Sequence, residues 1–138
     1  MITEIRVQFK DVDLSQRIHY SSLFNYFEVA DHHFLREIGY PYNKLFALGY
    51  FLPRVHVECD YLGLIEYDDV LQIRISIEKL GNTSFVYLFE FINAESGAAV
   101  ARGKMANVCI DKNSGKPVQI PDFLREKLAG HLIHSSSI

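Results

Sequence analysis

The sequence predicts an α+β domain in which an antiparallel sheet wraps around one long helix. Between residues 21 and 38, apolar residues recur at steps of three and four, which is typical of an amphipathic helix. After this segment, four runs alternate apolar and polar residues and are joined mostly by short turns, as expected for hairpin-connected strands. Successive hairpins give antiparallel pairing, and one helix against such a sheet forms two layers.

The first strand is expected over residues 4–9, where Ile5, Val7 and Phe9 alternate with polar residues. A polar stretch over residues 10–17 separates it from the helix. Either Ser21 or Ser22 is suited to the N-cap position, and Gly39 followed by Pro41 is suited to end the helix. The face expected to be buried carries Leu23, Phe27, Ala30, Phe34 and Ile38.

The remainder of the chain is expected to be rich in strands. A short helix or turn over residues 41–50 leads into it, and a short helix beginning at Pro121 follows it. In the predicted sheet, Ala101 and Gly103 are small enough for their strand to approach the helix closely. The four strands are expected at residues 54–61, 71–78, 85–92 and 100–110, and the last residues, 134–138, are expected to fray.

Composition limits the class of protein. With 138 residues, of which 49% are hydrophobic, the chain fits one domain over residues 1–138. A net charge of −3 gives no broad basic field for nucleic acid or an anionic membrane surface. No apolar run is long enough to span a membrane, and the charged start of the chain does not match a signal peptide, so a cytoplasmic protein is expected. The two cysteines, Cys59 and Cys109, lack metal-site spacing and are expected as free thiols, so no metal site is predicted.

Three stretches of the chain resemble the hotdog-fold thioesterases, in particular the 4-hydroxybenzoyl-CoA thioesterase and YbgC-like acyl-CoA thioesterase group. They are FKDVDLSQRIHYSSLFNYFEVA, VHVECDYLGLIEYDDVLQIRISIEKLGNTSFVYLFEF and GAAVARGKMANVCIDKNSGKPVQIPDFLREKL, so the resemblance covers nearly the whole chain. It implies the hotdog fold and hydrolysis of an acyl-CoA or aroyl-CoA thioester without a cofactor. It also implies a homodimer, or a tetramer built as a dimer of dimers, with the active site between subunits.

The resemblance assigns the chemistry to the first of these stretches. Asp13 falls on the family's catalytic carboxylate, which acts as general base or nucleophile. The backbone amide of Tyr20, at the start of the helix, falls on the group that polarises the thioester oxygen. A helix N-terminus suits this role because its N–H groups are free and its dipole is positive there. Asp11 is expected to form the turn or to support Asp13.

Alternatives remain for this site. Asp13 could be an ordinary solvated loop carboxylate, and His19, with a pKa near neutrality when unperturbed, is the second candidate for the base. Glu28 in the helix is a further candidate, since some hotdog enzymes use a helix carboxylate; otherwise it is structural and pairs with a basic residue of the sheet. A hotdog dehydratase using His19 and Glu28, or a binding module for acyl-CoA or acyl-carrier protein without catalysis, are the competing functions.

The substrate is expected to contact residues outside this centre as well. Coenzyme A phosphates favour Arg or Lys, and Arg102 and Lys104 lie two residues apart, so they share one face of a strand. Three positions differ from the family's pattern: Gln16, which is followed by Arg17, replaces a frequent Gly; Ser22 replaces Asn; and Asp31 replaces Arg. The predicted substrate contacts are Ser21, Ser22, Phe24, Tyr61, Arg54, Arg102 and Lys104, with Lys112 as a further phosphate candidate and with Tyr20, Phe24 and Tyr61 forming an acyl tunnel.

Overall fold

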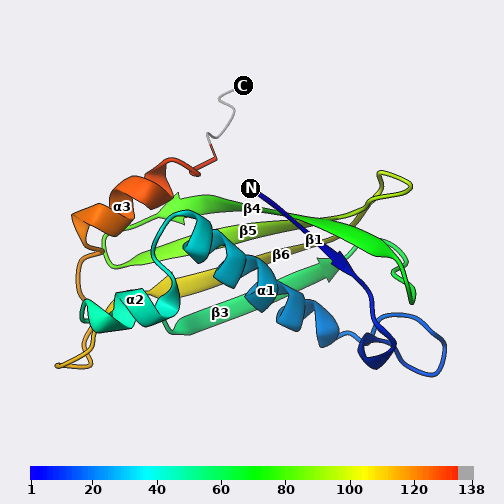
Figure 1. The fold of residues 1–138 in the computed structure, drawn as a ribbon, viewed down its shortest axis with the longest axis horizontal. Helices are drawn as coiled ribbons and strands as arrows, with labels where there is room; N and C mark the ends of the chain where they lie inside the picture. Colours follow the sequence, from blue (N-terminus) through cyan, green and yellow to red (C-terminus); the bar gives the residue numbers. More distant parts are fainter. Residues whose placement is uncertain (134–138) are drawn as a thin grey trace.

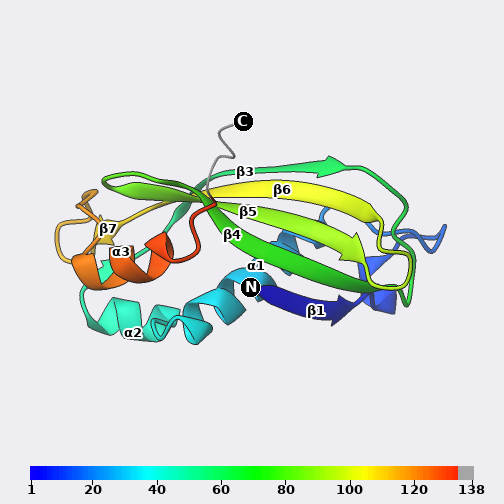
Figure 2. The same cartoon turned by 90° about the horizontal axis from the view of Figure 1, so that it is seen from above.

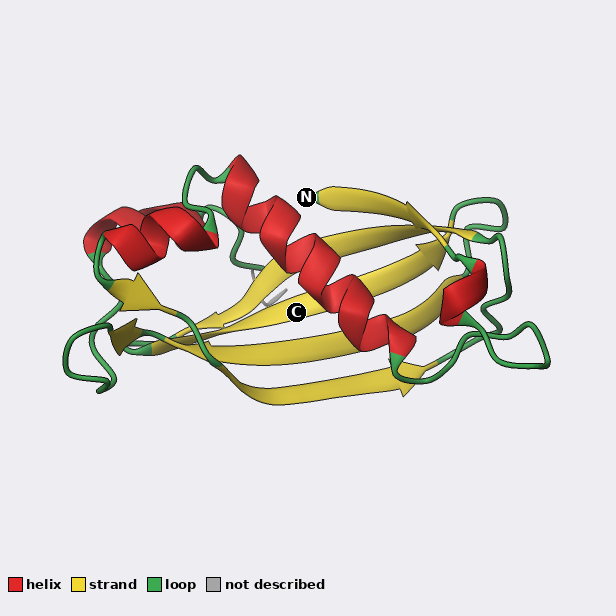
Figure 3. Ribbon diagram, turned by 60° about the horizontal axis from the view of Figure 1, so that its bottom comes forward, coloured by secondary structure: helices red, strands yellow, loops and turns green. Residues whose placement is uncertain are grey.

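The computed structural model describes residues 1–133 and contains a five-stranded antiparallel sheet with one long helix across its concave face (Figures 1, 2 and 3). The strands lie in the order β1-β4-β5-β6-β3, so β1 and β3 form the two edges. The predicted α+β architecture is therefore confirmed. The strands are β1 (Ile2–Arg6), β3 (Arg54–Tyr61), β4 (Val70–Leu80), β5 (Ser84–Asn93) and β6 (Ala99–Val108); the helices are α1 (Ser22–Glu37), α2 (Tyr42–Ala47) and α3 (Asp122–Ala129).

The first strand is shorter than predicted. It ends at Arg6, and Phe9 lies in a 3₁₀ turn, η1 (Phe9–Asp11), with its side chain 73% exposed. The turn forms because the Gln8 amide donates a hydrogen bond to Oδ2 of Asp11 at 3.0 Å, which closes the backbone on itself. This local carboxylate–amide bond prevails over the alternation of residues 4–9.

The last predicted strand divides into two. β6 ends at Val108, and Ile110–Asp111 form β7, which pairs with β2 (Tyr50–Phe51) in a separate two-stranded ribbon. Alternation alone continues through both pieces, so the break was not predicted. The expected fraying of residues 134–138 lies outside the described residues. In the part of the chain that is described, no helix is long and apolar enough to cross a membrane.

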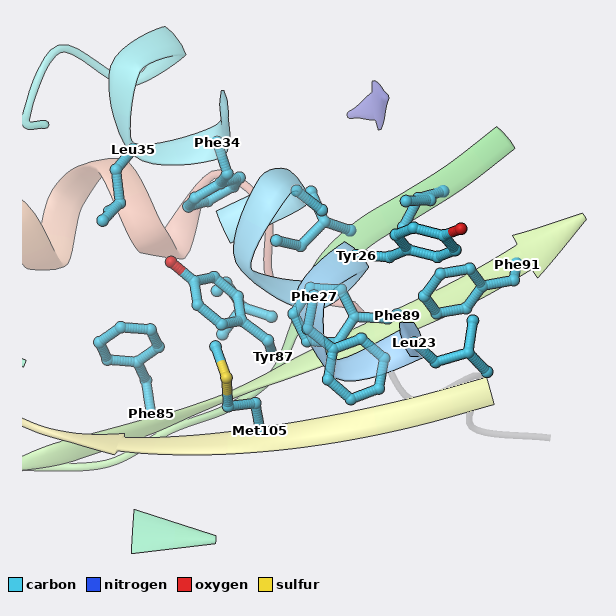
Figure 4. Close-up of a cluster of buried hydrophobic side chains, with 14 of the residues drawn as sticks. Leu23, Tyr26, Phe27, Phe34, Leu35, Phe85, Tyr87, Phe89, Phe91 and Met105 are labelled. Carbon is cyan, nitrogen blue, oxygen red and sulfur yellow. The ribbon is translucent and has the colours of Figure 1, made fainter. Parts of the chain in front are cut away.

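Helix α1 packs its predicted face onto the sheet. Leu23, Phe27, Ala30 and Phe34 have at most 1% of their surface exposed, and Ile38 is also buried. The helix ends as predicted, with Gly39 in the left-handed region at φ +93°. Figure 4 shows the resulting core, in which aromatic side chains from α1 and β5 interleave.

Helix and sheet approach each other closely at Gly103. A Cβ atom on this residue would lie 2.2 Å from Cζ of Phe27, so only a hydrogen fits between strand and ring. The Phe27 ring in turn stacks on Phe89, with ring centroids 4.4 Å apart and planes 5° apart. The prediction that small residues let β6 approach the helix is confirmed, and this contact sets the height of α1 above the sheet.

Substituting Gly103 tests this packing. Gly103→Ala forces the buried Phe27 ring to move, and we expect a loss of about 1–3 kcal/mol in the free energy of unfolding, measured by urea denaturation. Gly130→Ala is the matched control, because its nearest neighbour would lie at an ordinary 3.5 Å. An equal effect of the two substitutions would contradict the close contact.

Candidate active site

A short hairpin-like loop connects η1 to α1 and carries the predicted catalytic carboxylate. Val12 and Ile18 form a β-bridge across it, and the Asp13 amide donates to the Arg17 carbonyl at 3.0 Å. Gln16 occupies the tip in the left-handed region at φ +62°, a conformation that Gly adopts most readily. The loop therefore holds Asp13 a few residues from the start of the helix.

The side chain of Asp13 is exposed and ionised. Its Oδ1 atom accepts hydrogen bonds from the backbone amide of Ser15 at 2.8 Å and from the Ser15 hydroxyl. These bonds, with a smaller contribution from His19, hold the pKa of Asp13 below its ordinary value. Asp13 is therefore an ionised carboxylate at neutral pH, which can accept a hydrogen bond or a proton but cannot donate one.

Asp11, only two residues earlier, is buried and structural, as expected. Its Oδ2 atom accepts from the Tyr26 hydroxyl at 2.7 Å, in addition to the Gln8 amide. Its carbonyl oxygen accepts from the His19 amide at 2.8 Å and from the Ser22 hydroxyl at 2.9 Å. Asp11 therefore fastens the loop to the first turns of α1.

The first turn of α1 lacks the predicted serine cap. Ser21 occupies the N-cap position but has helical backbone angles, φ −76° and ψ −17°, so its hydroxyl does not reach the first-turn amides. It shares a hydrogen bond with Nδ1 of His19 at 2.8 Å instead. The Ser22 hydroxyl is bound to Asp11. The expected capping role of these serines is wrong, because both hydroxyls hold the preceding loop.

Tyr20 stands at the junction of loop and helix. Within residues 1–133, its backbone N–H donates no hydrogen bond, while its carbonyl accepts one from the hydroxyl of Tyr61 at the end of β3. The Tyr20 side chain is 68% exposed and stacks on His19 with centroids 4.7 Å apart. The structure thus brings together the predicted residues Tyr20, His19, Ser21 and Tyr61.

Two hollows flank α1. One, of about 400 Å³, is the α1–β3 groove, and the other, of about 590 Å³, lies between α1 and β1 and is the α1–β1 hollow. Asp13 lines neither, and within the described chain its carboxylate faces open surface. The α1–β3 groove is lined by Phe24, Asn25, Phe27, Glu28, Arg54, Val57 and Met105; the α1–β1 hollow by Ile5, Arg6, Gln8, Lys10, Asp11, Val12, His19, Ser21, Ser22, Asn25, Tyr26 and Val29.

The predicted phosphate-binding residues are not brought together. Arg54 lies on the helix side of the sheet, where it forms an ion pair with Asp31 at 2.7 Å. Arg102 and Lys104 do share one face, as predicted, but it is the opposite face of the sheet, where Lys104 pairs with Glu78 at 2.9 Å. Lys112 is elsewhere again, with its ammonium 4.6 Å from the ring centroid of Phe46.

Some residues around the site were not singled out from the sequence. Arg6 and Lys10 are basic residues that line the α1–β1 hollow, and their positions at and just after the end of the first strand could have indicated this. Glu28 pairs with His32 of the same helix at 3.8 Å, so the expected partner on the sheet is wrong, because the i, i+4 neighbour is closer.

In residues 1–133, no group of three or more acidic, histidine or cysteine side chains is arranged to hold a metal.

Comparison with known proteins places this geometry in a family. Residues 7–128 match the model of the thioesterase-like superfamily. The acyl-CoA thioester hydrolase YbgC of Escherichia coli O6:H1 is 26% identical over 119 residues, which cover 85% of this chain and 87% of that protein.

Solved structures agree with this match. A protein of Aquifex aeolicus superposes with a TM-score of 0.86 at 31% identity, over 93% of this chain and 98% of that one. The gentisyl-coenzyme A thioesterase BH1999 superposes with a TM-score of 0.82 at 27% identity, over 93% and 99% of the two chains. The sheet order and the single helix across it are the hotdog fold, as the resemblance implied. The chain therefore belongs to the thioesterase-like superfamily and is a thioester hydrolase.

Proposed function

We propose that the chain hydrolyses acyl-CoA or aroyl-CoA thioesters at the N-terminus of α1. The observation that carries this proposal is the Tyr20 amide, which lies two residues before the first residue of the 16-residue helix α1 and has no acceptor within residues 1–133. A backbone N–H in this position, aligned with the positive end of the helix dipole, is suited to an oxyanion. The relatives' names, acyl-CoA thioester hydrolase and gentisyl-coenzyme A thioesterase, support CoA thioesters as the substrate class.

Asp13 takes the reacting proton or the acyl group. As general base, it removes a proton from water, whose oxygen attacks the thioester carbonyl carbon; the C–S bond then breaks and the proton passes to the leaving thiolate. As nucleophile, Asp13 itself attacks the carbonyl carbon, the C–S bond breaks and CoA leaves as the thiolate; water then hydrolyses the resulting anhydride and regenerates the Asp13 carboxylate. Both routes need the ionised carboxylate that the Ser15 hydrogen bonds favour.

The neighbours of Tyr20 position the oxyanion donor. The Tyr61 hydroxyl holds the Tyr20 carbonyl, and the Ser21 hydroxyl holds the ring of His19, on which the Tyr20 ring stacks. We assign His19 a supporting role beside Asp13, because its Nδ1 atom already accepts from the Ser21 amide at 3.3 Å. The exposed faces of Tyr20 and Phe24 are proposed to contact the acyl group.

We further propose that two copies of the chain pair through β3. This strand is an edge of the sheet, and its side chains are largely exposed, with Val55 60% and Tyr61 45% exposed. An unpaired edge strand of eight residues with exposed valines is a ready template for a second strand. Pairing there would also place a second subunit beside the open α1–β3 groove, and two such dimers could form a tetramer.

Coenzyme A phosphates need basic residues within reach of this site. We keep Arg102 and Lys104 as proposed contacts, since they line a hollow of about 200 Å³ on the outer face of the sheet. Glu58 and Asp60 share that hollow. A phosphate there would therefore depend on Arg102, for which residues 1–133 provide no ion pair.

Substitutions of Asp13 and Glu28 show which of the two carboxylates carries the chemistry. We expect Asp13→Asn to lower kcat for acyl-CoA hydrolysis by about 10²–10⁴-fold, as measured by thiol release, because the amide neither accepts the proton nor attacks. Glu28→Gln is expected to lower kcat by less than about tenfold, and Asp122→Asn, on exposed α3, is the matched control. Full activity in Asp13→Asn would refute the mechanism, and loss in Glu28→Gln alone would assign the chemistry to the helix.

The hydrogen bond from Ser15 predicts a shift in pH dependence. Because this bond stabilises the ionised form and lowers the pKa of Asp13, Ser15→Ala should raise that pKa toward its ordinary value. The acid limb of the kcat/KM profile should therefore move to higher pH, with little change above neutrality. An unchanged acid limb would show that Asp13 is not the group that must be ionised.

Pairing of two copies through β3 can be tested by measuring the mass of the protein in solution. Val55→Asp places a charge on the exposed edge, and two copies would bring like charges together across the pairing strands. We expect sedimentation to give the mass of one chain for this variant and of two or four chains for the wild type. A wild-type monomer, or a variant that stays paired, would contradict pairing through β3.

A further inference from the structure

A buried ion pair lies beneath the third turn of α1, away from the proposed reaction centre. Asp31 has no exposed surface, and its Oδ2 atom accepts from the Arg54 guanidinium at 2.7 Å and from the Tyr42 hydroxyl at 2.8 Å. Its other oxygen, Oδ1, has no partner within residues 1–133. Even a paired buried carboxylate seldom adds net stability, because both charged groups lose hydration, so this arrangement calls for a reason beyond packing.

Arg54 is the member of the pair that reaches the surface. Its side chain is about one-third exposed and forms part of the α1–β3 groove. Asp31 holds one Nη atom, Nε points to the sulfur of Met105 at 3.2 Å, and the ring of Tyr42 lies 5.7 Å from the guanidinium carbon. The second Nη atom donates no hydrogen bond within residues 1–133. The guanidinium is thus fixed from several sides while one end stays available.

The α1–β3 groove extends from Phe24, four residues after Tyr20, to Arg54. On α1, Phe24 and Glu28 are one turn apart and share the face that lines the groove, and Tyr20 lies just before the helix begins. Along β3, Val57 lies on the same face as Tyr61, four residues before it. From Ser22, the first residue of α1, to Asp31 the helix rises by about 14 Å, at 1.5 Å per residue.

The groove walls determine what it can hold. Phe24, Phe27, Val57 and Met105 are apolar and suit a hydrocarbon chain or fused rings. An extended chain of about ten to twelve carbons covers this length, at roughly 1.25 Å per C–C bond along the chain. A single benzene ring attached to the thioester ends well before Arg54.

We propose that Arg54, held in place by Asp31, determines specificity by donating a hydrogen bond to a hydroxyl oxygen at the far end of a long acyl group. This inference rests on the proposed function, which places the thioester at Tyr20. A hydroxyl fits better than a carboxylate, because Asp31 already neutralises Arg54 and the Glu28 carboxylate in the same groove repels an anion. The buried pair then keeps a hydrogen-bond donor aimed into a groove whose walls are largely apolar.

The test compares two non-hydrolysable CoA thioethers, one carrying a 12-hydroxydodecyl chain and one a dodecyl chain. We expect the wild type to bind the hydroxylated compound about tenfold or more tightly in calorimetry, the value of one charge-assisted hydrogen bond. Arg54→Met combined with Asp31→Asn should reduce this preference to within about threefold of unity, without leaving a buried charge unpaired. Arg74→Met, an exposed arginine on the outer face of β4, is the control and should keep the preference.

Other outcomes decide against the proposal or separate it from the proposed function. Equal binding of the two compounds by the wild type, or a preference that survives in the double variant, would overturn it. The proposal would also be overturned if the substitution of Arg54 changed the preference between 4-hydroxybenzoyl-CoA and benzoyl-CoA, because a single ring does not span the groove. If the double variant does not fold, Arg54→Lys replaces it in the test. This variant keeps the positive charge beside Asp31 and should also lose the preference for the hydroxylated compound.

Turnover distinguishes the two proposals. If the hydroxyl preference is present in binding but neither 12-hydroxydodecanoyl-CoA nor dodecanoyl-CoA is hydrolysed, the specificity site stands and the proposed function falls. If both are hydrolysed at equal kcat/KM and bound equally, the proposed function stands and the specificity site falls. Hydrolysis with the same preference as binding supports both.

Discussion

The contact between Gly103 and Phe27 is the constraint on which the arrangement of this molecule depends. With no side chain on Gly103, the Phe27 ring lies directly on β6 and stacks on Phe89, so α1 lies low across the concave face of the sheet (Figure 4). The height of the helix in turn decides where its ends fall. Its N-terminus comes within hydrogen-bonding reach of Tyr61, and its third turn places Asp31 over Arg54. One packing contact thus aligns both the proposed reaction centre and the proposed specificity site.

Three aspartates within a short stretch of the chain have different roles because their environments differ. Asp11 is buried and holds the loop against the helix, whereas Asp31 is buried and holds an arginine. Asp13 alone faces the surface, with a pKa kept low by Ser15 rather than raised by burial. Burial acts in the opposite direction on Asp31 and raises its pKa, although the Tyr87 and Tyr42 hydroxyls and the Arg54 guanidinium oppose that effect. The exposed, readily ionised carboxylate is the one available to a substrate.

Much of this fold follows from periodicity. The helical spacing of Leu23 to Ile38 predicted the buried face of α1, and the small size of Gly103 predicted the close approach of β6. What periodicity did not predict depends on single hydrogen bonds: the turn that Asp11 imposes after β1, and the serine hydroxyls that bind the loop instead of capping the helix. The pairing of Asp31 with Arg54 was also missed, because it joins residues 23 positions apart that share no motif. The roles assigned to Asp13 and Tyr20 depend on resemblance and stay predictions.

The central claim is that the Tyr20 amide stabilises the oxyanion, and removing that single N–H tests it most directly. Tyr20→Pro deletes the N–H, whereas Tyr20→Ala keeps it and removes only the ring. Because this amide donates no hydrogen bond within residues 1–133, its loss should leave folding, checked by circular dichroism and urea unfolding, largely intact. We predict that kcat for thioester hydrolysis falls by about 10²–10³-fold in Tyr20→Pro and by no more than a few-fold in Tyr20→Ala. A folded Tyr20→Pro variant with a kcat equal to that of Tyr20→Ala would contradict the account.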